Sequence, residues 1–202
     1  LDEGYEGLTR TIEVLDHLGI AHTGTFSSSE TEKRYLVMEK NGIKFAFYSL
    51  TYGVNATYEA SLCQDVPKHV NLLRYKKKQF SKNALKRFWQ TSLRPGLKKI
   101  YLRRTKGTII PQRIDQLTPN SYDPTLLQQV DLTISKAKAE SDILVVLLHI
   151  GGQFNTIPGT FSEYIFHHLS EQGADIIIGH HPHTTQKIST GGGYSICLFS
   201  WS

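Results

Sequence analysis

Six of the nine histidines fall between positions 149 and 183, and they are the residues of this chain best suited to chemistry. His149 follows the apolar run ILVVLL, whereas His180, His181 and His183 follow the run DIII. Neutral imidazole is a good ligand for Zn, Mn, Fe or Ni. Pro182 fixes one backbone angle between two of these histidines, so their rings can be presented at a low entropic cost. The pattern therefore predicts a metal-binding or catalytic site.

The two apolar runs that precede these histidines predict buried parallel strands. Ile143–Leu148 and Asp175–Ile178 are nearly continuous in β-branched or aliphatic residues, and segments with helical patterns alternate with them. Such alternation is typical of a parallel sheet covered by helices. Because the carboxyl ends of neighbouring strands in such a sheet form a common crevice, we expect His149, His181 and His183 to converge there.

Apolar spacing and turn residues predict the remaining elements. Apolar residues from Leu8 to Leu18 recur at helical spacing, and Gly19 follows where a helix C-cap belongs. Asn41-Gly42 is the strongest short hairpin signal. The other predicted elements are strands at Ile20–His22, Tyr35–Glu39 and Ile43–Leu50, helices at Pro124–Ala139 and Phe161–Glu171, and a final hairpin of Gln186–Ser189 and Tyr194–Phe199.

Composition is that of a globular domain. The chain has 202 residues, of which 39% are hydrophobic and 20% charged, ordinary values for one domain with a substantial core.

No run approaches the roughly 18 apolar residues of a membrane-spanning helix. Cys63 and Cys197 lie far apart without a second pair, which argues against a zinc ribbon or a disulfide framework. Residue 1 is Leu and Met38 is the only methionine, so we expect upstream residues, including any export signal or anchor, in the natural protein.

Charge is distributed unevenly along the chain. Between Asp65 and Asp115 there is no acidic residue, yet 15 of the 23 Lys and Arg residues fall there, although the formal net charge is only +5. The remainder carries 8 basic and 18 acidic residues. This composition boundary predicts a basic helical insertion at residues 66–114 within a single partial domain, 1–202, of acidic α/β character.

The basic segment also has apolar residues at helical spacing, for example Phe80, Leu85 and Trp89, and Pro95 opens a second candidate helix. A basic amphipathic helix of this kind can bind an anionic membrane surface or an acidic polymer, and a solvated helical cap is the alternative. No nucleic-acid motif accompanies it, which argues against nucleic acid as a partner. The residues predicted to bind a polyanion are Lys76, Lys77, Lys78, Lys82, Lys86, Arg87, Lys98, Lys99, Arg103 and Arg104.

Three stretches resemble motifs of the CapA-type bacterial capsule-synthesis proteins, in the same order and at similar spacing. Asp2 and Gly4 resemble the aspartate and glycine of the family's Asn-Asn-His-x-x-Asp-x-Gly motif. His149–Pro158, HIGGQFNTIP, is similar to the family's His-Trp-Gly-x-Glu-Tyr…Pro loop, and Gly179–His183 is similar to its His-Pro-His segment. Further similarity covers Leu50–Tyr52, Gln186–Ile188 and Leu198–Ser202.

The resemblance implies a metallophosphatase-like sandwich of two β-sheets with flanking helices, here without its N-terminal strands. It also implies a pair of divalent metals, with Mn, Zn or Fe as candidates. Members of the family are associated with making or exporting poly-γ-glutamate capsule, usually as proteins anchored at the outer side of the cell membrane. The implied site residues are His149, His181 and His183 as metal ligands, Asp2 and His180 (a variable family position) as catalytic candidates, and Gly152, Gln153 and Gly179 as site-lining residues.

The chain departs from the family pattern where charge is needed. Ile150 replaces a tryptophan, and Gln153 stands where a glutamate is expected. Glutamine can form hydrogen bonds, but it cannot supply negative charge to a metal or act as a base. A two-metal hydrolytic site needs bridging carboxylates, and of these only Asp2 remains, where it could equally favour a helix dipole. We therefore expect the metal site to be incomplete in this chain.

These observations favour a capsule-biosynthesis or export protein with a metallophosphoesterase-like site. It would act on or near an acidic polymer or anionic membrane at the cell surface, within a capsule-synthesis complex. A metal-dependent phosphatase or phosphodiesterase of the same architecture is the first alternative. A non-catalytic module that binds polyanions or membranes is the second. All three stay open at this point, because a fold does not determine its function.

Overall fold

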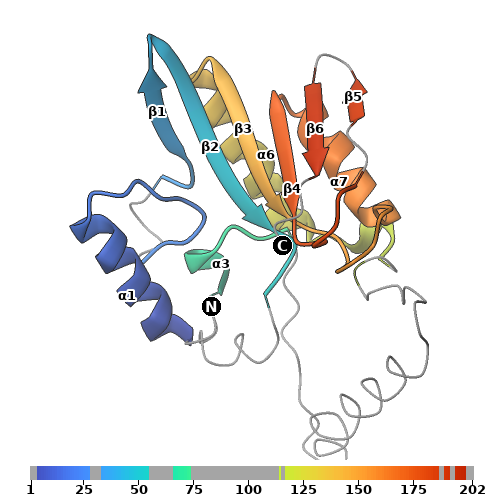
Figure 1. Cartoon of the computed structure of the whole chain (residues 1–202), viewed down its shortest axis with the longest axis horizontal. Coiled ribbons are helices and arrows are strands. Elements are labelled where there is room, and N and C mark those ends of the chain that lie inside the picture. The colour runs from blue at the N-terminus through green and yellow to red at the C-terminus, as the bar shows by residue number, and fades with distance from the viewer. Residues whose placement is uncertain are drawn as a thin grey trace, which may run out of the picture.

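The structure is a computed structural model that describes residues 4–27, 33–54, 66–73, 114, 117–186, 189–191 and 194–198. It contains both helices and strands, which Figure 1 shows in their arrangement around one sheet. In chain order they are α1 (Gly4–His17), β1 (Leu36–Lys40), β2 (Ile43–Thr51), α3 (Val66–His69), the 3-10 turn η2 (Pro119–Ser121), α6 (Pro124–Ala139), β3 (Ile143–His149), α7 (Thr160–Glu171), β4 (Ile176–His180), β5 (Ser189–Gly191) and β6 (Tyr194–Leu198).

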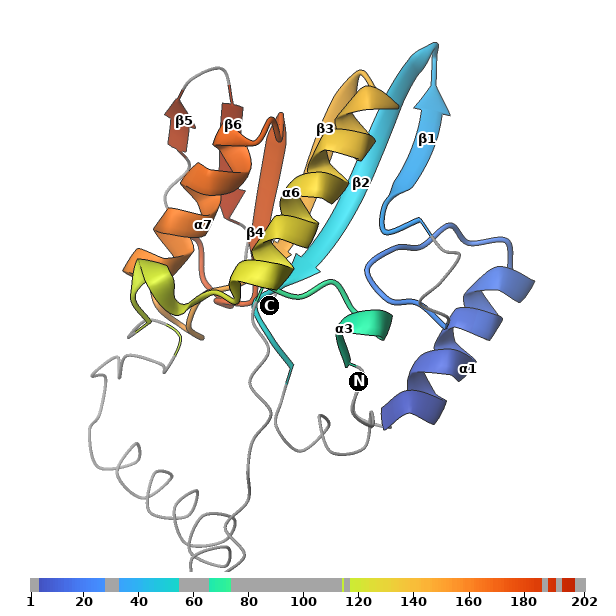
Figure 2. The ribbon, with the colours of Figure 1, turned by 180° about the vertical axis from the view of Figure 1, so that it is seen from behind.

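The described strands form one six-stranded sheet in the order β1-β2-β3-β4-β6-β5. Strands β2, β3, β4 and β6 are parallel, and the antiparallel strands β1 and β5 form the two edges. Helices α6 and α7 cover one face of the sheet, which Figure 2 shows from the helix side. The parallel α/β character predicted from the alternating pattern is therefore confirmed.

The core lies between this helical layer and the sheet. Asp123 caps the amino end of helix α6, because its side chain accepts hydrogen bonds from the backbone N–H groups of Thr125 and Leu126. One stripe of α6 then turns inward, and Ile134 is fully buried there. Phe161 at the start of α7 and Leu148 on β3 are also fully buried. Alternate strand residues face this layer, because successive side chains of a strand point to opposite faces.

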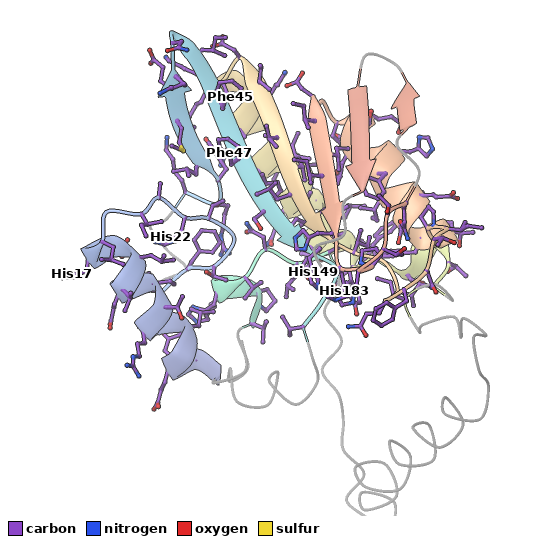
Figure 3. All side chains as sticks on the ribbon, viewed as in Figure 1. His17, His22, Phe45, Phe47, His149 and His183 are labelled. Carbon is purple, nitrogen blue, oxygen red and sulfur yellow. The ribbon has the colours of Figure 1, made fainter. Side chains whose placement is uncertain are left out.

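The opposite face of the sheet is less covered. Strand β2 alternates between fully buried residues and the half-buried Phe45, Phe47 and Ser49. Phe45 and Phe47 stack with ring centroids 6.4 Å apart, and Figure 3 shows both rings on the sheet. Leu147 on β3 is half-buried as well. The second sheet predicted for a sandwich is not among the described residues, which form a single sheet.

Most predicted element boundaries agree with the structure within a few residues. The Asn41-Gly42 turn joins β1 and β2 with φ values of 54° and 79°, as a two-residue hairpin requires. The strand predicted at Ile20–His22 is wrong. The backbone N–H of Ile20 donates to the carbonyl of Leu15, 2.9 Å away, and so closes the end of α1 instead of pairing with a strand.

Both ends of the predicted basic insertion, 66–114, pack into the domain. Val66 and Leu73 are fully buried, and Ile114 is 4% exposed in the same main core cluster as Leu73. Val70 and Leu72 form isolated β-bridges to Thr25 and Thr51. These ends therefore belong to the domain and do not project from it. Residues 74–113, with all ten predicted polyanion-binding residues, lie outside the described residues.

Candidate functional site

The parallel register places three polar side chains in one row at the carboxyl ends of neighbouring strands. Thr51, the last residue of β2, is paired with His149, the last residue of β3. His149 is in turn paired with His180, the last residue of β4. Residues in register on adjacent strands point to the same face. This row therefore forms the floor of the candidate site, on the face of the sheet opposite α6 and α7.

The histidines of the two loops meet directly. The Nδ1 atoms of His149 and His180 lie 3.1 Å apart, within hydrogen-bonding distance. The ring centroids of His149 and His181 are 4.4 Å apart, and those of His181 and His183 are 5.9 Å apart. Figure 3 shows His149 and His183 together below the ends of the strands. The structure thus brings all four histidines together at the carboxyl ends of the parallel strands, although His183 is exposed at the margin of this group.

Backbone hydrogen bonds connect the loop after β3 with the loop after β4. The N–H of Ile150 donates to the carbonyl of His180 at 3.0 Å, and the N–H of Phe154 donates to the carbonyl of Pro182 at 2.5 Å. At Gly151, with φ of 101°, an added Cβ would lie 3.1 Å from Cγ of Pro182. Glycine therefore allows these two loops to approach closely.

Backbone strain gathers in the same two loops. Among the described residues, the non-glycine residues with positive φ are Asn41 in the hairpin turn, Phe154 (63°), His181 (110°) and His183 (53°). This conformation is unfavourable for residues with a Cβ, and it persists where surrounding contacts impose it. Two of the predicted site histidines are thus held in strained conformations, as is common at functional sites.

Two of the four histidines, His149 and His180, favour their neutral form. Burial, together with the neighbouring rings of His181, His180 and His183, lowers the pKa of His149 to about 4. Burial also lowers the pKa of His180 below its ordinary value. In a neutral imidazole one nitrogen carries a proton and the other has a lone pair. Hence one of the two Nδ1 atoms donates to the other across the 3.1 Å contact.

This hydrogen bond limits what the pair can bind. The histidine that donates through Nδ1 keeps a lone pair on Nε2, whereas the one that accepts carries its proton on Nε2. The pair in this arrangement therefore offers one imidazole ligand to a metal, with the second ring orienting the first. In the part of the chain that the structure describes, no three His, Cys, Asp or Glu side chains are placed to hold a metal ion. The described residues do not by themselves form a complete metal centre.

A cavity of about 350 Å³ opens beside the histidines, and most of its polar lining was not predicted from the sequence. Thr51 could have been found by the carboxyl-end rule that predicted His149, because it ends the preceding strand. Tyr52, whose ring centroid is 6.4 Å from that of His181, follows it. The other unpredicted polar lining residues are Thr23, Thr25, Ser49 and Asn71.

The remaining predicted site residues have different positions. Gly152 is buried in the loop after β3, and Gly179 is buried within β4. Gln153 is exposed and does not line the cavity. Ile150, which replaces the family's tryptophan, is 1% exposed and packs in the main core. Asp2 lies outside the described residues.

Comparison with known proteins assigns the chain to a family. The profile of a family described as bacterial capsule synthesis protein PGA_cap matches residues 1–197. The PGA biosynthesis protein CapA of Bacillus subtilis (strain 168) is 40% identical over 60 residues, which is 30% of this chain and 16% of that protein. The capsule biosynthesis protein CapA of Bacillus anthracis is 36% identical over 62 residues, 31% of this chain and 15% of that protein. The matched segments thus span about a sixth of the length of these curated relatives. Because the family profile covers nearly the whole chain and includes both histidine loops, the chain belongs to the bacterial capsule synthesis protein PGA_cap family.

Proposed function

We propose that this chain is part of a CapA-type protein that takes part in the biosynthesis or export of poly-γ-glutamate capsule. The observation that carries the proposal is the family match over residues 1–197, which includes the histidine loops and the strands that position them. The acidic polymer is the proposed substrate or cargo. A capsule-synthesis complex at the cell surface is the proposed partner.

The proposed fold is a metallophosphatase-like sandwich, of which the described sheet is one layer. The half-buried apolar residues Phe45, Phe47 and Leu147 on the face opposite the helices support this proposal. Apolar side chains on both faces are expected for a sheet that is covered on both faces. A second sheet on this face would enclose the histidine row between the two layers.

The proposed site is the imidazole part of a divalent metal centre. His149, His181 and His183 would provide the ring nitrogens, while His180 would orient the ring of His149 through the contact between their Nδ1 atoms. The carboxylates of such a centre would come from residues outside those described, Asp2 among them. A bound metal would act as a Lewis acid toward a phosphoryl or carbonyl oxygen. Position at the carboxyl ends of parallel strands supports this assignment, and it also supports a metal-dependent phosphatase or phosphodiesterase as the alternative.

The proposed location is the outer side of the cell membrane. Within the described ranges, no helix is long and apolar enough to cross a membrane. The basic residues between Lys76 and Arg104 are proposed to contact the acidic polymer or an anionic membrane surface. Attachment of that kind would weaken as salt is added, because exposed charges are screened beyond about 10 Å at 0.1 M.

Polymer release in the organism that encodes the chain tests the capsule proposal. Poly-γ-glutamate in the medium would be measured after the gene is deleted and then restored as wild type, His149→Ala or His167→Ala. His167 is an exposed histidine on α7 and serves as the matched control. We expect the wild type and His167→Ala to restore release and His149→Ala to fail. Unchanged release after deletion would contradict the function, and full restoration by His149→Ala would contradict the site.

Elemental analysis of the purified protein tests the metal proposal. Bound Mn, Zn and Fe would be measured for the wild type, for His149→Ala, for His181→Ala and for the control His167→Ala. We expect His149→Ala and His181→Ala to lose metal, because each of them removes an imidazole that neighbouring groups hold in place. The control His167→Ala should keep its metal. Equal metal content in all four proteins would show that these histidines do not bind metal.

A further inference from the structure

A side chain helps to join the loop after β3 to the loop after β4. Two backbone hydrogen bonds connect these loops close to the strand ends. Further from the strands, the side-chain Nε2 of Gln186 donates to the backbone carbonyl of Asn155 at 2.6 Å. This third bond differs from the first two because a side chain makes it, so a substitution can remove it.

Both partners of this bond are buried. Gln186 is 7% exposed and Asn155 is 8% exposed. Glutamine is mostly found on protein surfaces, and burial of a polar group is costly unless the group is hydrogen-bonded. Losing such a bond leaves the remaining partner without water to replace it. The bond is therefore a fixed connection between the two loops and not a fluctuating surface contact.

The Gln186 bond lies next to the strained parts of both loops. Phe154, which directly precedes Asn155, has φ of 63°. His181 and His183, which precede Gln186 in the other loop, have φ of 110° and 53°. Strained conformations of this kind persist only where surrounding contacts impose them. A bond that joins the loops just beyond these residues is placed to impose them.

The contacts among the histidines are of two kinds. His149 and His180 are in register as the last residues of their strands, so strand pairing brings their rings together. His181 and His183 lie beyond the end of β4. The ring of His181 is 4.4 Å from that of His149, and the ring of His183 is 5.8 Å from that of Phe154, measured between centroids. These two contacts depend on how the loops are held against each other.

We propose that Gln186 is a positioning residue of the histidine site. Its bond to Asn155 holds the loop after β4 against the loop after β3, and so places His181 and His183 close to His149. The geometric part of this inference rests on the contacts alone. Its consequence for metal binding rests on the proposed function, in which these three histidines provide the ring nitrogens.

NMR of the chelator-treated protein with labelled histidine tests the geometry, because nuclear Overhauser effects report which imidazole rings are close. Gln186→Met keeps the length of the side chain and removes its donor. We expect this variant to lose the effects between His149 and His181. It should keep those between His149 and His180, because strand pairing holds that pair. A residue with a general structural role would weaken both contacts or neither.

Two control variants separate positioning from other effects. Gln128→Met makes the same change at an exposed residue of α6 and should leave both ring contacts unchanged. Asp175→Ala removes the acceptor of a buried N–H at the amino end of the sheet, so it destabilises the domain without touching the loops. Both ring contacts should persist in it too. Gln186→Asn, whose amide is one methylene shorter, is a second variant in case Gln186→Met does not fold, and it should lose the same contact.

Metal titration gives the second readout. The affinity of Gln186→Met for Mn or Zn should be about 10- to 100-fold lower than that of the wild type, the usual effect of losing a group that orients the ligands. Unchanged ring contacts in both Gln186 variants would overturn the proposal. So would failure of both variants to fold, or equal loss of the His180 contact. Loss of the His181 contact alone, with a wild type that binds neither metal, would uphold the positioning role and count against the proposed metal centre.

Discussion

The two ends of the parallel sheet are built differently. At the amino end, Asp142 and Asp175 immediately precede β3 and β4 and form hydrogen bonds to the neighbouring strand. Asp175 donates from its backbone to the carbonyl of Leu144 at 3.0 Å, and its carboxylate accepts from the N–H of Leu144 at 2.7 Å and from Lys138. Asp142 bonds to Lys44 in the same two ways, at 2.9 and 2.7 Å.

At the carboxyl end the same strands finish in Thr51, His149 and His180, and the loops beyond them carry positive φ values at Phe154, His181 and His183. The polar groups at the amino end stabilise the sheet, whereas those at the carboxyl end surround a cavity and lie in strained loops. The difference indicates that the amino end serves stability and that the carboxyl end is arranged for binding.

The largest expected change in the free energy of unfolding comes from a core residue at the start of the strained loop after β3. Ile150 follows His149 and is 1% exposed. Ile150→Ala should lower the free energy of unfolding by about 2–5 kcal/mol, because it leaves a cavity in the core. Urea unfolding measures this change. Ile157→Ala, at a residue that is 75% exposed in the same loop, should change it by less than about 0.5 kcal/mol. Equal losses in the two variants would show that Ile150 does not anchor the loop.

The amino end should respond next most strongly. Asp175→Ala removes the acceptor of the Leu144 N–H, and Leu144 is fully buried. We expect a loss of about 1–3 kcal/mol in the free energy of unfolding, the usual effect of leaving a buried donor unsatisfied. Asp142→Ala should cost less, because that residue is exposed. The NMR signals of His149 should stay unchanged in both, and movement of these signals would break the separation between the two ends.

A glycine substitution tests whether the backbone at His183 is strained. His183 has φ of 53°, so His183→Gly should raise the free energy of unfolding by about 0.5–1 kcal/mol. His167 lies within α7 and is exposed. The same change there should lower the free energy of unfolding by about 0.5–1 kcal/mol, because glycine weakens a helix interior. Thermal unfolding of both variants gives the sign. Destabilisation by His183→Gly would mean that the ring's contacts outweigh the strain.

Protonation of His149 should have the smallest effect on the free energy of unfolding at neutral pH, and this effect should grow as the pH is lowered. The folded-state pKa of His149 is about 4, whereas an unfolded histidine has a pKa of about 6.5. Between these values the unfolded state binds the proton more readily, so stability should fall as the pH is lowered from about 6.5 to about 4. Urea unfolding of chelator-treated protein across this range measures the loss, which should be smaller in His149→Gln. An NMR titration of His149 with a midpoint near 6.5 would contradict the prediction.

Much of the fold follows from local patterns in the sequence. Helix α6 was predicted at its observed bounds, Pro124–Ala139. In the structure Asp123 caps its first turn, and its buried residues continue to Ala137. Strands β3 and β4 were evident from their uninterrupted apolar runs. The failure at Ile20–His22 has a physical reason. An apolar residue that follows a C-capping glycine often completes the helix end, and a short sequence window does not separate this role from that of a strand.

The sequence by itself determined which residues end the parallel strands. It therefore determined that His149 and the Gly179–His183 segment lie at the same end of the sheet, the carboxyl end of the strands. Only the tertiary structure decided which atoms meet there: the Nδ1 contact between His149 and His180, the positive φ values of the loops, and the cavity that joins Thr23, Ser49 and Thr51. The physical reason is that strand pairing is set by patterns repeated along the chain, whereas burial, strain and cavity walls depend on contacts between segments far apart in sequence. No local pattern encodes these contacts.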